Sequence, residues 1–187
     1  MKPANPASHG KLLASIGSKL AKIEKSDMPE LSAGPRAFNE WVKQPGAIEV
    51  SMGWMKTAIN DELIFTRHMA DCSAIVLCTN YDESTGAYAQ RSLMHVVGSN
   101  LSVSDLTKDT LTLLDMASQS LSKPRCIIAL GTNVANDHFT TIANQEIRTS
   151  EGNMVKPFKE LQTLCDTVIL ERKNSIAVRS DGNYLVL

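Results

Sequence analysis

The strongest constraint on the fold of this chain is a succession of four short strand-like runs after residue 46, with no room for a helix between them. The connections between these runs, among them NDE and NYDESTGAY, have the polar and glycine-containing composition of turns. Strands that follow one another through short turns predict an antiparallel or mixed sheet. The four runs cover residues 47–55, 62–68, 72–80 and 89–99.

The rest of the chain alternates helical and strand-like patterns. Apolar residues at helical spacing predict a helix over 104–121, and a second helix over 153–166 has Pro157 close to its start. The run RCIIALGTNV between them has the continuous apolar character of a buried strand, and the final segment, 166–187, predicts a strand and then a hairpin across Asp181-Gly182. This order predicts a layered α/β (α+β) domain, with two main helices packed against one mixed, largely antiparallel sheet.

Residues 1–46 differ in composition from this domain. They combine a polar, proline-containing start, an apolar pattern from Leu12 to Ile23 that fits one amphipathic helix, and a Pro- and Gly-rich stretch that is mostly loop with one helical turn at 38–42. We therefore expect an N-terminal extension over 1–46 and a catalytic domain over 47–187. The amphipathic helix either covers part of the domain or serves partner binding or export.

Charge and hydropathy limit the partners. The formal net charge is -1, so the chain has no positive electrostatic field that would attract nucleic acid or an anionic membrane. No apolar run approaches the roughly 18–20 residues that span a bilayer, and the N-terminus lacks the apolar core of a secretory signal. We expect a cytoplasmic protein whose partners are proteins or small molecules.

Four cysteines are present without a CxxC pair, so a zinc ribbon or a thioredoxin-type motif is not available. Cys78, Cys126 and Cys165 lie in apolar surroundings, where a cysteine usually behaves as a small buried hydrophobe. Cys72 differs because it follows a polar interruption in the run LIFTRHMADCSAIVLC.

This interruption is unexpected in a core strand, because each buried polar group without a partner costs roughly 1–3 kcal/mol. A bend at the sheet end or a reactive site would explain it. A thiolate at Cys72 could act as a nucleophile with His95 as its base, and Thr66 could orient the imidazole. His68 is a competing base on the same segment, and a metal site at His68 and Cys72 lacks further ligands. Taken alone, this cysteine and histidine favour an ordinary core cysteine and a hydrogen-bonded histidine over a catalytic pair.

The order of elements and the residues within them resemble one known family. The segments IEVSMGWMKTAINDELIFTRHMADCSAIVL and AQRSLMHVVGSN are similar to the opening of the chemoreceptor glutamine deamidases (CheD), in which a threonine precedes the nucleophilic cysteine by six residues and a histidine lies on the next strand. Here the matching positions are Thr66, Cys72 (72 minus 66 is six) and His95. The resemblance continues through CIIALGTN, VKPFKEL and SIAVRSDGNYLVL, although RHMADC replaces a glycine-rich approach to the cysteine. Toxin deamidases of the cytotoxic necrotizing factor type share this cysteine and histidine arrangement.

The resemblance implies a hydrolase that converts glutamine side chains of a protein to glutamate with release of ammonia and without a cofactor. Cys72 would be the nucleophile, His95 the base and Thr66 its orienting partner. The implied substrates are chemotaxis receptors, and a chemotaxis phosphatase is an implied partner. Two alternatives stay open: a secreted effector that deamidates a host protein, and a non-catalytic binding module on the same scaffold.

Overall fold

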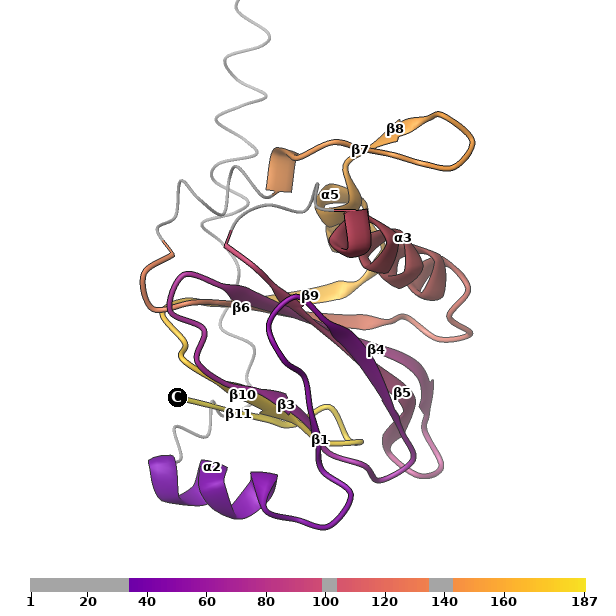
Figure 1. The fold of residues 1–187 in the computed structure, drawn as a ribbon. Coiled ribbons are helices and arrows are strands. Elements are labelled where there is room, and N and C mark those ends of the chain that lie inside the picture. Colours follow the sequence, from indigo (N-terminus) through magenta and orange to yellow (C-terminus); the bar gives the residue numbers. More distant parts are fainter. Residues whose placement is uncertain (1–33, 99–103, 135–142) are drawn as a thin grey trace, which may run out of the picture.

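The computed structural model describes residues 34–98, 104–134 and 143–187 (Figure 1). The helices are α2 (Pro35–Val42), α3 (Ser104–Ser118) and α5 (Pro157–Leu164). The strands are β1 (Ile48–Glu49), β2 (Met55–Ile59), β3 (Ile64–Thr66), β4 (Ser73–Asp82), β5 (Ala87–Val96), β6 (Arg125–Leu130), β7 (Ile147–Arg148), β8 (Met154–Val155), β9 (Asp166–Leu170), β10 (Ile176–Val178) and β11 (Tyr184–Val186).

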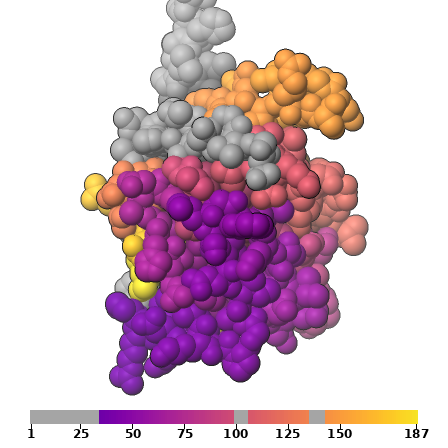
Figure 2. All heavy atoms as spheres, in the orientation of Figure 1, coloured from indigo at the N-terminus to yellow at the C-terminus, as the bar shows by residue number. Residues whose placement is uncertain are grey.

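The strands form two main sheets and one short ribbon. The large sheet has the order β2-β5-β4-β6-β9 and is antiparallel except for the pair β6 and β9. The small sheet has the order β1-β3-β10-β11, in which β1 and β3 are parallel and the other pairs are antiparallel. The β7–β8 ribbon protrudes from the body beside the helices (Figures 1 and 2).

Four layers enclose three apolar clusters. The two sheets pack face to face, α3 and α5 cover the other face of the large sheet, and α2 covers the outer face of the small sheet (Figure 1). Strand β4 lies in the middle of these layers and contributes side chains to both of its faces. Ala74 and Val76 point toward the small sheet, whereas Ile75 and Leu77 point toward the helices. A strand buried on both faces needs apolar residues at every position, which accounts for the unbroken run after Cys72.

The layered class predicted from the sequence is confirmed, but the number of sheets and the length of the second helix differ from the prediction. The strands do not form a single sheet, because β3 does not pair with β2 or β4, its neighbours in the sequence. It pairs instead with β1 and with the distant strand β10. The second predicted helix is also shorter than expected: β8 occupies its beginning, and α5 starts at Pro157, where a missing N–H costs nothing.

Helix α2 belongs to the packed body. The sequence places this stretch in the N-terminal extension, mostly as loop, whereas the structure has a helix whose Phe38 is fully buried against Leu63, Phe65 and Leu185. The predicted amphipathic helix at 12–23 lies outside the described residues, so its role stays a prediction. No helix within the described ranges is long and apolar enough to cross a membrane.

The predicted C-terminal hairpin is confirmed. Strands β10 and β11 pair antiparallel, and Arg179 and Asn183 close the turn through the Arg179 N–H and the Asn183 carbonyl at 2.9 Å. Gly182 occupies the left-handed region with φ +79°, as a glycine in such a turn does at little steric cost.

Candidate active site

Cys72 and His95 lie at the same end and on the same face of the large sheet. Cys72 immediately precedes β4, and His95 is directly opposite Ala74 in the β4–β5 ladder. Because side chains alternate along a strand, Cys72 points to the same face as Ala74 and is a diagonal neighbour of His95. Both residues face the small sheet and are nearly buried, with 7% of Cys72 and 2% of His95 exposed.

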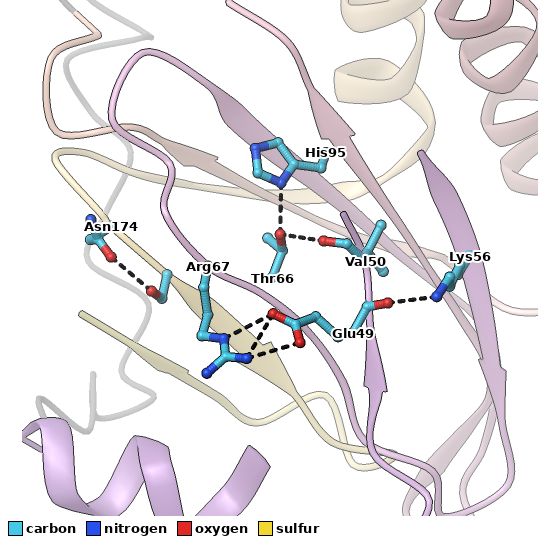
Figure 3. A network of polar contacts seen from close by, with 8 residues as sticks. Glu49, Val50, Lys56, Thr66, Arg67, His95 and Asn174 are labelled. Atoms are coloured by element: carbon cyan, nitrogen blue, oxygen red, sulfur yellow. Dashed lines mark hydrogen bonds and ion pairs between the residues drawn. The ribbon is translucent and has the colours of Figure 1, made fainter. Parts of the chain in front are cut away.

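Thr66 approaches this pair from the small sheet. It is the last residue of β3, is fully buried, and lies next to Val50, which follows β1. The Thr66 Oγ1 atom donates to the Val50 carbonyl at 2.7 Å and lies 2.7 Å from Nδ1 of His95 (Figure 3). The site is therefore assembled across the interface of the two sheets.

These two contacts determine the tautomer of His95. A hydroxyl has one proton, and a carbonyl oxygen can only accept, so the Thr66 proton goes to Val50. Thr66 Oγ1 must then accept from His95, which places a proton on Nδ1. In the neutral imidazole the lone pair is consequently on Nε2, the atom that a general base uses.

The surroundings of His95 favour this neutral form. Burial lowers the pKa of the imidazole, and the nearby Val50 carbonyl acts in the opposite direction as the smaller influence. Within the described part of the chain, Nε2 is buried and has no hydrogen-bond partner. A buried nitrogen without a partner is costly, and a catalytic role is one explanation for such an exception.

The Cys72 thiol is turned toward a different neighbour. Its Sγ lies 3.6 Å from the Sδ atom of Met52, whose side chain is mostly exposed. Rotation about the Cα–Cβ bond of Cys72 moves the sulfur between staggered positions without moving the backbone. The diagonal placement of His95 means that such a rotation can bring the thiol toward Nε2.

The segment before Cys72 is held by the turn that follows β6. Gly131, Thr132 and Asn133 donate their N–H groups to the carbonyls of Cys72, Met69 and Ala70, at 2.9, 3.0 and 2.9 Å. A Cβ atom at Gly131 would lie 2.2–2.5 Å from three of these carbonyl oxygens, so only glycine fits. In a trans peptide the N–H points opposite to the C=O, so the N–H groups that follow these carbonyls point away from the turn.

The other polar residues of the interruption have structural roles. Arg67 forms a bidentate pair with Glu49 through Nε and Nη2, both at 2.9 Å, and thus links β3 to β1 (Figure 3). Asp71 accepts from the Asn133 side chain at 3.0 Å. His68 is exposed, with φ +63°, and Cys72 and His68 have no third ligand nearby: among the described residues, no group of three or more His, Cys, Asp or Glu could hold a metal ion.

The remaining cysteines lie in the interior, as predicted. Cys78 and Cys126 are fully buried and Cys165 nearly so. Burial raises the pKa of Cys78 to about 12, despite the opposing influence of Arg125 and Arg91. The pKa of Cys126 is raised by its hydrogen bond with Cys165 and by burial, whereas the same bond lowers the pKa of Cys165.

Sequence reasoning missed three parts of the site: the Val50 carbonyl, Met52 and the anchoring turn at 131–133. The glycine in SMGW indicates a turn, but nothing in that pattern connects it to Cys72. A scan of the chain against models of known protein families gives no match, and a search of curated proteins finds none either. The assignment of the site therefore depends on its geometry and on the motifs described above.

Proposed function

We propose that the chain is a cysteine-dependent protein-glutamine deamidase. The observation that carries the proposal is the double hydrogen bond of Thr66, which gives His95 a neutral tautomer with its Nε2 lone pair free, on the sheet face that also presents Cys72. A cysteine nucleophile, a histidine base and a third residue that orients the histidine are the groups that thiol-based acyl transfer requires.

The first half of the reaction forms a thioester. Nε2 of His95 takes the proton of the Cys72 thiol, and the thiolate attacks the carboxamide carbon of a substrate glutamine. The C–S bond forms, and the carbonyl oxygen becomes an oxyanion. Collapse of this intermediate breaks the C–N bond as Nε2–H protonates the amine, which leaves as ammonia.

The second half regenerates the enzyme. Water loses a proton to Nε2 and attacks the thioester carbon, after which the C–S bond breaks and the Cys72 sulfur regains a proton. The product is glutamate. The peptide N–H groups of Ala70 and Asp71 are candidate donors to the oxyanion, because the carbonyls that precede them, of Met69 and Ala70, accept hydrogen bonds from the turn after β6.

We propose the substrate class from the resemblance to the chemoreceptor deamidases. Glutamines on the helical cytoplasmic domain of chemotaxis receptors would be the targets, and a chemotaxis phosphatase would be a partner.

The test combines two readouts on two substrates. The chain is incubated with a chemoreceptor cytoplasmic fragment and with unfolded casein as a general glutamine donor, while ammonia and the mass of the peptides are followed. We expect ammonia and glutamate from the wild type, none from Cys72→Ser or His95→Gln, and parental activity from Cys126→Ser. Equal ammonia release by Cys72→Ser on either substrate would overturn the proposal.

A further inference from the structure

The turn Ser51–Trp54 is attached to the backbone of His95. The Trp54 N–H donates to the Ser51 carbonyl at 3.1 Å, and Gly53 at the third position has φ +81°, as a type II turn requires. The Gly53 N–H donates to the His95 carbonyl and the His95 N–H to the Trp54 carbonyl, both at 3.0 Å. The position of this turn is thus fixed relative to the candidate base.

Met52 lies at the corner of this turn and covers the thiol. Its Sδ atom is 3.6 Å from Sγ of Cys72, and Met52 itself is 59% exposed whereas Cys72 is only 7% exposed. A methionine side chain has three rotatable bonds, so it can move aside without any change in the backbone. A substrate that approaches Cys72 from the side of Met52 can therefore displace this flexible side chain.

Two further exposed apolar residues lie on this turn or against it. Trp54 belongs to the same turn and is 65% exposed, and Val97 is 40% exposed. A Cβ atom at Gly53 would lie 3.4 Å from Cγ2 of Val97, so the valine side chain lies against the turn. Exposed tryptophan beside other large apolar residues is typical of recognition surfaces.

We infer that Met52 is a movable cover over Cys72, and that Met52, Trp54 and Val97 receive a large apolar side chain adjacent to the target glutamine. The identity of this occupant rests on the proposed deamidase function, whereas the cover rests on the sulfur contact alone. Apolar surface next to a few polar reacting groups is the usual composition of a substrate site. The enzyme would accordingly prefer glutamines flanked by large apolar residues.

Alkylation of Cys72 tests the cover without any turnover. Met52→Ala should react with iodoacetamide about fivefold faster than the wild type, whereas Met52→Leu, which retains the bulk, should stay close to the parental rate. Met154→Ala is the matched control, since Met154 is 51% exposed on β8 and its loss should leave the rate unchanged. A parental rate in Met52→Ala would overturn the cover.

A larger reagent tests the apolar surface. With N-benzyl iodoacetamide, the wild type should show a rate advantage over iodoacetamide that free glutathione does not show, and Trp54→Ser should lose most of it. An advantage that persists in Trp54→Ser would overturn the recognition role. If both labelling results are as expected but ammonia is never released, the proposed deamidation fails while the cover and the apolar surface stand.

Discussion

The Oγ1 atom of Thr66 lies 2.7 Å from Nδ1 of His95, and this contact joins the small sheet to the large sheet at the candidate site. The hydroxyl orients the imidazole and also selects its tautomer, because its own proton is given to the Val50 carbonyl. A residue that exchanges no covalent bond with the substrate thereby determines whether Nε2 can accept a proton.

Thr66→Val should lower both the stability and the reactivity of Cys72. The substitution keeps the side-chain shape but leaves the Val50 carbonyl and the Nδ1 proton without their partner, which we expect to cost about 1–3 kcal/mol of unfolding free energy. Thr66→Ser should retain most of the alkylation rate. Urea denaturation and iodoacetamide kinetics measure the two effects.

Thr79→Val provides the control for this experiment. The Thr79 hydroxyl is also buried in a strand but has no hydrogen-bond partner among the residues that the structure describes, so its removal should be neutral or stabilising. Equal destabilisation by the two substitutions would argue against a specific role for the Thr66 hydroxyl.

His95 should make stability depend on pH. Because burial holds its pKa below the ordinary value of 6.5, the unfolded chain binds more protons than the folded chain in this range. The free energy of unfolding should therefore decrease as the pH falls below about 6.5 and level off below the pKa of the folded state. Chemical denaturation across this range should show that His95→Gln lacks this component and that His68→Gln, at an exposed position, retains it.

The thiols should differ in reactivity by position. Cys72 should be alkylated first at neutral pH, because the methionine side chain over it can move aside, and Cys78 last, because its pKa is raised to about 12 in the core. Peptide mapping after limited iodoacetamide treatment gives the order. Cys165→Ser is the informative control, since the lowered pKa of Cys165 makes it the main competitor, and its loss should leave the labelling of Cys72 unchanged.

Gly131→Ala should disrupt the approach to Cys72. The added methyl group would meet three backbone carbonyl oxygens that no side-chain rotation can move, so we expect a loss of about 1–3 kcal/mol or more together with altered thiol reactivity. Gly34→Ala is a suitable comparison, because a Cβ atom there meets nothing within 4 Å. Thermal unfolding that is unchanged in Gly131→Ala would contradict the anchoring role of the turn.

Deletions should separate α2 from the residues that precede it. Removing residues 1–46 eliminates Phe38, which is fully buried against the small sheet, whereas removing residues 1–33 leaves α2 in place. We expect the longer deletion to be less stable than the shorter one by about 3–5 kcal/mol, the usual cost of deleting a buried phenylalanine side chain. Comparable melting temperatures for the two deletions would show that α2 adds little to the packing.

The sequence predicts several local elements, but not the full length of α2, the turn that divides the run 47–55, the β7–β8 ribbon or the pairing of the strands. Alternation and turn composition located β4, β5 and the final hairpin, because these features depend on neighbouring residues. The pairing of β3 with β10 brings Phe65 next to Ala177, although most of the domain sequence separates these two residues. No local pattern specifies such a contact. Spacing and resemblance identify Thr66, Cys72 and His95 as candidate site residues. The Val50 carbonyl is a backbone group, which the identity of a side chain does not reveal.

The central position of β3 in the small sheet has a consequence for the order of events during synthesis. Thr66 is placed by a strand whose other neighbour, β10, is synthesised well after Cys72 and His95. The imidazole of His95 thus acquires its orienting hydroxyl only when the C-terminal strands have docked. A nascent chain that contains Cys72 and His95 but not yet β10 should consequently have an unreactive thiol, and the thiol should become reactive only after β10 has docked.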